Sequence, residues 1–181
     1  MLPIGPLMIE HRLIERMIKL MDKALERAEK KKEVNTRFIE TATDFIRAYA
    51  DRCHHGKEED ILFRELQTRN LSEEHRNIMD ELIQEHQWGR KTTGRLVQAN
   101  QQYSGGDKEA LSTIVECMRA LTEFYPKHIE KEDKQFFIPV MGYFTQEEKD
   151  AMLREGYEFD SRLLHEEYRH IVANQEETSG S

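Results

Sequence analysis

The stretch CHHGKEEDILF, residues 53–63, is repeated 74 residues later as KHIEKEDKQFF, residues 127–137. The chemically active residues that correspond in this register are His54 with His128 and Glu58 with Glu132. A His and a Glu four residues apart lie on one face of a helix, about one turn from each other. Apolar residues follow both pairs at once. Because a solvent-exposed face has no reason to repeat so closely, the repeat predicts two helices that bury a shared polar site.

A second element repeats with almost the same spacing. EHRLIER, residues 10–16, is echoed by EHQWGR, residues 85–90, which places His11 and His86 75 residues apart. Each half of the chain therefore supplies one lone His on an apolar stripe and one His-x-x-x-Glu pair. The pattern predicts two similar helical hairpins whose polar residues face one another.

The remaining chain signals favour an all-helical fold. Apolar residues recur at spacings of three and four along every long segment, no strand pattern occurs, and loops are marked by KKKEVN, NLS and YSGGD. We predict an antiparallel four-helix bundle over residues 1–142 and an additional C-terminal helix packed on it over 143–175. Thr145 and Glu148 form a capping box at the start of that fifth helix. Residues 176–181 read as a disordered tail.

Composition limits the classes of function. The 181 residues carry 34% charged side chains and a net charge of −8, which argues against a general binder of nucleic acid or of anionic membranes. No apolar run approaches the roughly 20 residues of a membrane span. The two cysteines are far apart and suit reduced thiols. We therefore expect a cytoplasmic protein without nucleic-acid or membrane partners; the oligomeric state stays open.

The repeated residues are the donor set of a two-metal site. Each imidazole can give one nitrogen to a metal, and each carboxylate can bridge two metals. Isolated His-x-x-x-Glu pairs are common on charged surfaces, but burying four His and two Glu without partners would cost several kcal/mol each. The predicted ligands are His11, His54, Glu58, His86, His128 and Glu132. Mixed nitrogen and oxygen donors fit iron best, although manganese and zinc would accept them.

In these residues the chain resembles the hemerythrin-like, or HHE cation-binding, family over about residues 7–140. The resemblance implies a four-helix bundle that holds two non-haem iron ions, bridged by oxide or hydroxide, and that meets oxygen, nitric oxide or peroxide. Oxygen-carrying hemerythrins have a further His where Leu82 stands here, and an Asp five residues after the fourth-helix His, where this chain has Glu132 at four. These departures are more similar to the di-iron repair and nitrosative-stress proteins of the family than to simple oxygen carriers.

Several neighbouring residues are additional candidates. His55 and Glu59 form another His-x-x-x-Glu pair, but the second copy has Ile129 and Asp133 instead, so the repeat favours His54 with Glu58. His165 on the fifth helix is either a surface residue or an extra ligand. The candidates for additional ligation, or for hydrogen bonds to a ligand, are His165, His55, Glu59, Asp133, Tyr49 and Tyr125.

Three functions fit these observations. The centre can bind, sense or reduce a small molecule such as oxygen, nitric oxide or peroxide, with redox activity as the form that catalysis would take. Alternatively, the protein can store or donate iron, as a di-iron repair protein does. A sensory module is a third reading. With four imidazoles and two bridging carboxylates, six-coordinate metals would keep about one open position each, unless His165 closes one of them.

Overall fold

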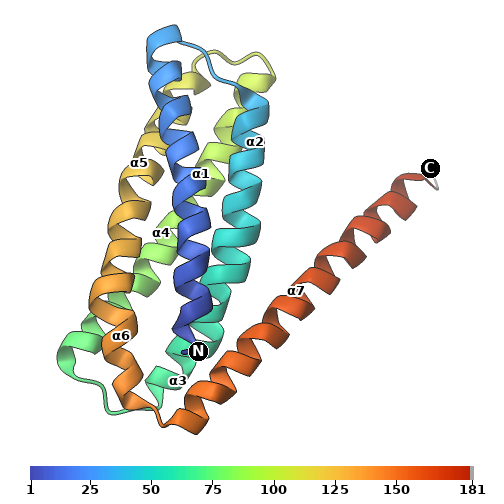
Figure 1. The fold of residues 1–181 in the computed structure, drawn as a ribbon. Helices are drawn as coiled ribbons and strands as arrows, with labels where there is room; N and C mark the ends of the chain where they lie inside the picture. Colours follow the sequence, from blue (N-terminus) through green and yellow to red (C-terminus); the bar gives the residue numbers. More distant parts are fainter. Residues whose placement is uncertain (180–181) are drawn as a thin grey trace.

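The computed structural model describes residues 1–179, without the side chains of residues 166–168 and 170–179. Four helical segments form an antiparallel bundle, which confirms the predicted all-helical fold (Figure 1). The first helix of the bundle is α1 (Ile4–Lys31) and the third is α4 (Glu73–Ser104). The second is a continuous rod of successive helical segments: α2 (Thr36–Phe45), η1 (Ile46–His55), η2 (Glu58–Phe63) and α3 (Arg64–Gln67). The fourth is a similar rod: α5 (Ala110–Lys131), η3 (Glu132–Phe136) and α6 (Phe137–Val140). A short 3-10 turn, η4 (Met141–Tyr143), leads to α7 (Gln146–Ser179).

The ends of the helices follow from local side-chain chemistry. The Asn35 side chain accepts a hydrogen bond from the backbone N–H of Phe38, and the Ser72 hydroxyl accepts one from the N–H of His75. Such caps satisfy backbone donors that have no partner inside the helix. The predicted capping box is present, because Thr145 N–H donates to Glu148 Oε2 at 2.8 Å and Glu148 N–H donates to the Thr145 hydroxyl.

The hydrophobic core is divided into two clusters. One fills the end of the bundle near the α1–α2 loop and includes Ile14, Met21 and Leu121. The other fills the opposite end and includes Leu7, Phe63 and Phe137. Between them lies a layer of buried polar side chains. The two clusters cover that layer from its two ends and hold its side chains in place.

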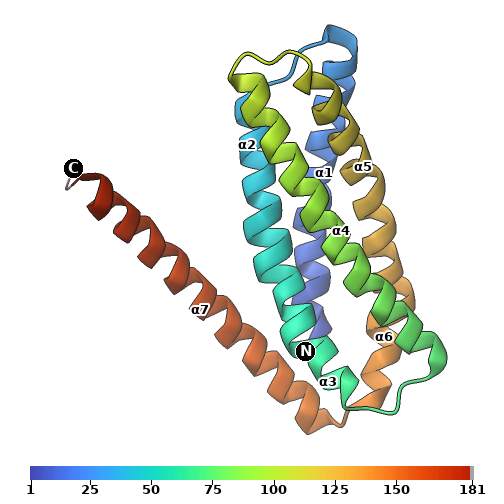
Figure 2. The same cartoon turned by 180° about the vertical axis from the view of Figure 1, so that it is seen from behind.

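Among the residues with described side chains, the fifth helix contacts the bundle along its first part. Met152 is buried in the second core cluster, and Phe159 packs against it. Beyond that region α7 runs away from the bundle in both views (Figures 1 and 2). The described part of α7 ends at Ser179 and residues 180–181 lie outside the described part of the chain, so the disordered tail over residues 176–181 stays a prediction. No helix among the described residues has the length and apolar character required to cross a membrane.

Candidate metal centre

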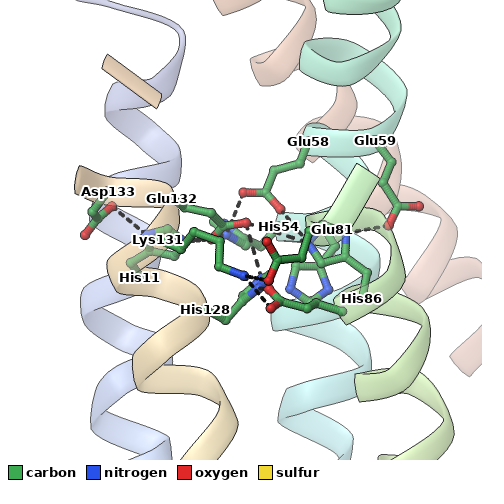
Figure 3. A network of polar contacts seen from close by, with 12 residues as sticks. His11, His54, Glu58, Glu59, Glu81, His86, His128, Lys131, Glu132 and Asp133 are labelled. Carbon is green, nitrogen blue, oxygen red and sulfur yellow. Dashed lines mark hydrogen bonds and ion pairs between the residues drawn. The ribbon is translucent and has the colours of Figure 1, made fainter. Parts of the chain in front are cut away.

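Six buried side chains meet in the middle of the bundle, one layer deep between the two core clusters (Figure 3). None of the six is more than 1% exposed. They are His11 from α1, His54 from η1, Glu58 from η2, His86 from α4, His128 from α5 and Glu132 from η3. These are the six residues predicted as ligands, and the structure brings all of them together.

The histidines divide into two groups. The Nε2 atoms of His11 and His54 lie 2.8 Å apart, and these two residues form one group with the two glutamates. His86 and His128 form a second group with His55, whose ring stacks on that of His86 at a centroid distance of 3.9 Å. We refer to the first as the two-histidine group and to the second as the three-histidine group.

Each glutamate faces both groups. One oxygen of Glu58 lies 3.3 Å from Nε2 of His54, and its other oxygen lies 3.3 Å from Nε2 of His86. Glu132 has the same arrangement, with Oε2 at 3.1 Å from His11 and Oε1 at 3.2 Å from His128. Since each carboxylate divides its oxygens between the groups, both carboxylates are placed to bridge two ions.

The donor atoms fit two metal ions by spacing and by hydrogen bonding. Two ligand atoms at about 2.1 Å from an octahedral ion, at a right angle, lie about 3.0 Å apart, which is close to the separations found here. All four oxygens of Glu58 and Glu132 are buried and have no hydrogen-bond partner. The same holds for Nε2 of His86 and of His128. Buried polar atoms without partners are costly, and a coordinated cation removes that cost.

A second set of carboxylates orients the histidines through their outer nitrogen. His54 Nδ1 donates to Glu10 at 2.9 Å and His11 Nδ1 donates to Asp133 at 2.8 Å. In the other group, Nδ1 of His86 donates to Glu59 and Nδ1 of His128 donates to Glu85. A carboxylate at this position fixes the tautomer, directs Nε2 inward and makes the imidazole a stronger ligand. We call these four acids the carboxylate ring.

The ring has a regular order. Each acid accepts a hydrogen bond from the histidine of the next bundle helix in chain order. The acid of α1 pairs with the histidine of the α2–α3 rod, the acid of that rod with the histidine of α4, and the acid of α4 with the histidine of α5. The acid of the last rod pairs with the histidine of α1 and closes the ring. Each acid is also the chain neighbour of a ligand candidate. The four pairs of neighbours are Glu10 with His11, Glu59 with Glu58, Glu85 with His86, and Asp133 with Glu132.

The buried charges shift the titration of the site. Burial opposes protonation of His11, but the hydrogen bond to Asp133 and the nearby carboxylate of Glu132 outweigh it and raise the His11 pKa to about 10. Burial also opposes protonation of His86, yet its three carboxylate partners raise the pKa to about 11. For Glu132, burial and the charge of Glu58 favour the neutral form, but the histidines lower its pKa to about 2. The glutamates are therefore carboxylates at neutral pH, as ligation requires.

Three of the predicted ligands come from helical segments with π-type turns. η1 ends at His55, η2 begins with Glu58, and η3 begins with Glu132. A π-helix bonds each N–H to the fifth preceding carbonyl, and such turns often occur at functional sites. The wider turn brings consecutive side chains closer to one face. His54 and His55 are consequently both buried, at 1% and 3% exposure.

His55 lies closer to the predicted ligands than the repeat indicates. The repeat favoured His54 over His55 as the ligand, whereas the structure places both rings inside the bundle. Nδ1 of His55 lies 3.5 Å from Asp51, and the residue joins His86 and His128 in one group of donors. His55 therefore places a third imidazole beside His86 and His128 from the neighbouring rod, while Leu82 stands at the third-helix position.

The other candidates have different positions. Glu59 and Asp133 belong to the carboxylate ring. Tyr125 is buried and lines a cavity of about 250 Å³ that also reaches His55, while Tyr49 is half-buried and stacks on Phe45. Neither tyrosine makes a described hydrogen bond to a ligand candidate. His165 is exposed on α7 and belongs to no group of donors among the described residues, so the structure gives no support to its role as a ligand.

Comparison with protein families identifies the domain. The model of the hemerythrin HHE cation-binding domain matches residues 2–138, about three quarters of the chain. The chain belongs to this family. The match ends at α6, so α7 lies outside it. Comparisons with curated proteins and with solved structures gave no match. The hemerythrin domain binds cations, and its two groups of buried His and Glu in this chain can hold them.

Proposed function

We propose that this hemerythrin domain holds two iron ions, one at each histidine group, with Glu58 and Glu132 as bridging ligands. The observation that carries the proposal is the position of the four carboxylate oxygens. Each glutamate has one oxygen beside the two-histidine group and one beside the three-histidine group, and none of these oxygens has another partner. Imidazole nitrogens with bridging carboxylates form a donor set that suits iron.

We further propose that His55 makes the two ions unequal. Three nitrogens, two carboxylate oxygens and one bridging oxygen atom fill about six positions at the three-histidine group. The same count at the two-histidine group reaches about five and leaves one position open. This replaces the expectation of one open position at each metal, which did not include His55.

The open position is where a small ligand would bind, and oxygen, nitric oxide and peroxide are the candidates. The iron pair would supply the electrons and the Lewis acidity for binding or reducing such a ligand. Two features support this proposal: the core clusters cover the site from both ends, and the carboxylate ring holds the four histidines through Nδ1. The cytoplasmic location remains a prediction.

The test is a titration of the iron-loaded protein with azide or nitric oxide, followed by optical and EPR spectra. We expect about two irons per chain and one exogenous ligand per centre. His55→Ala should accept a second ligand, because it removes a nitrogen beside the cavity of about 250 Å³. His165→Ala is the matched control and should behave like the wild type. If the wild type binds two ligands, His55 is not a ligand; if it binds none while retaining both irons, an iron-storing or iron-donating role is favoured.

A further inference from the structure

The fifth helix docks on the turn of the second rod that carries the metal-binding residues. Gly56 follows His55 directly, and a Cβ atom at this position would lie 2.8 Å from the ring of Phe159 on α7. The missing side chain therefore allows the Phe159 ring to lie against the helix backbone. One turn earlier on α7, Glu155 accepts two hydrogen bonds from the guanidinium of Arg64, both at 2.8 Å. The Phe159 contact places α7 beside the site, whereas the Arg64–Glu155 pair is 47% and 36% exposed and contributes little to docking.

A chain of polar contacts leads from α7 to His54. Asp160 of α7 accepts from the ammonium of Lys57, with its oxygens at 2.8 and 3.0 Å. Lys57 also donates to Glu10, and Glu10 in turn holds Nδ1 of His54 at 2.9 Å. The Lys57 side chain is only 5% exposed, and this buried cation is shared between Glu10 at 11% exposure and Asp160 at 39%. Burial opposes its charge, but the two carboxylates outweigh this effect and raise the Lys57 pKa to about 12.

The other three members of the carboxylate ring are supported differently. Asp133 pairs with Arg12, Glu59 with Arg90 and Glu85 with Lys131, and all these partners belong to the bundle itself. The exposed fractions of the three cationic side chains are 55%, 37% and 17%. Among the described residues, the contacts behind His54 are the ones that use a buried cation and extend to α7.

We propose that α7 is a latch that sets the strength of the two-histidine half of the centre, with Asp160 as a positioning residue for His54. The inference rests on the proposed metal binding. With Asp160 present, Lys57 divides its donors between two carboxylates, and Glu10 keeps an oxygen for His54. When α7 moves away, Glu10 is the remaining described partner of Lys57. The ammonium group then attracts the negative charge of Glu10 more strongly and away from the imidazole of His54. Glu10 then accepts more weakly from Nδ1, and His54 becomes a weaker ligand.

The latch connects the metal site to a part of the molecule that extends from the bundle. The C-terminal part of α7 extends away from the bundle in Figures 1 and 2, so a displacement of that part would be transmitted to the contacts of Phe159 and Asp160. This half of the centre is also the one with the proposed open position. Release of α7 would weaken the iron there and leave His86 and His128 with their own carboxylates.

The experiment compares Asp160→Asn with Glu155→Gln in the full-length protein. Both changes replace a carboxylate on α7 with a neutral amide of similar size, and both remove an ion pair to the bundle, but Glu155 has no contact with the carboxylate ring. Each variant is loaded anaerobically with two equivalents of ferrous iron, and the transfer of iron to an excess of a coloured chelator is followed with time. The optical spectrum of cobalt-loaded protein is recorded in parallel.

We expect Asp160→Asn to release one of its two irons about tenfold faster than the wild type, in the range found for groups that orient metal ligands. The cobalt spectrum should change in the same variant. The iron release rate and the cobalt spectrum of Glu155→Gln should match those of the wild type. Asp160→Glu keeps a carboxylate at this position and should release iron nearly as slowly as the wild type.

Equal effects of Asp160→Asn and Glu155→Gln would show that α7 acts only through general stability, and would overturn the latch. A wild type that holds two irons and an Asp160→Asn variant with unchanged release would overturn it as well. A wild type that binds no metal would instead refute the proposed function. The failures of the two proposals are therefore distinguishable.

Discussion

Removal of the metals is expected to destabilise the bundle by several kcal/mol. Without cations, the four oxygens of Glu58 and Glu132 remain buried in the core without hydrogen-bond partners. At a free metal concentration about a thousandfold above its Kd, one bound ion stabilises the folded state by about 4 kcal/mol, so two ions contribute about 8 kcal/mol. For a domain of this size, about 1 kcal/mol corresponds to about 2–4 °C, which gives a difference in Tm of about 15–30 °C.

The assay is differential scanning calorimetry of the iron-free protein at increasing concentrations of free ferrous iron, without oxygen. Because the ions bind the folded chain, Tm should rise steadily with the logarithm of the metal concentration. A Glu58→Ala variant serves as the control, since it lacks a bridging ligand and should melt at nearly the same temperature at every metal concentration. A wild-type Tm that does not depend on metal, or an equal rise in the variant, would refute the reasoning.

Further changes give separate expectations. Glu58→Ala and Glu132→Ala should each lose both metals together, as elemental analysis would show, and loss of a single ion would contradict bridging. Since the pKa values of His11 and His86 are raised to about 10 and 11 in the metal-free chain, both rings are protonated at pH 7 and must become neutral to ligate. Metal binding should therefore release about two protons and weaken as the pH falls, which calorimetry in buffers of different ionisation enthalpy would detect; binding without proton release would argue against this. His165→Ala should leave the metal content and Tm unchanged, because the residue is exposed, and a loss of metal would restore it as a candidate.

The sequence predicts the bundle and the central six residues because both depend on periodicity. A His and a Glu four residues apart share a helix face in an α-helix and in slightly widened turns alike, so the pairs of His54 with Glu58 and of His128 with Glu132 were recognisable. The capping box at Thr145 is a local pattern of the same kind and is present in the structure. Such features require no knowledge of which helices become neighbours.

The parts that were missed depend on neighbouring helices or on deviations from α-helical geometry. The inward position of His55 accompanies the π-type turns of η1, which the α-helical periodicity did not predict. The partners of Glu10 and Glu85 lie on other helices, 44 and 43 residues away, so their role could not be read from spacing alone. A signal was nevertheless present, since an acid stands beside a ligand candidate at each of the four repeated positions. His165 was selected by residue type alone, and the path of α7 leaves it exposed.

The carboxylate ring closes at one link between the first and last helices of the bundle, and we propose that local opening at this link lets ions enter and leave without global unfolding. Its last link joins His11 to Asp133 across 122 residues of chain, whereas the other links span fewer than 50. Part of a fold can open locally while the rest persists. A brief separation of α1 from η3 would part His11 from Glu132 and expose the two-histidine group, with three helices still assembled. Backbone amides of α1 should then exchange with solvent sooner than those of α4, and iron should be exchanged at the same rate as these amides.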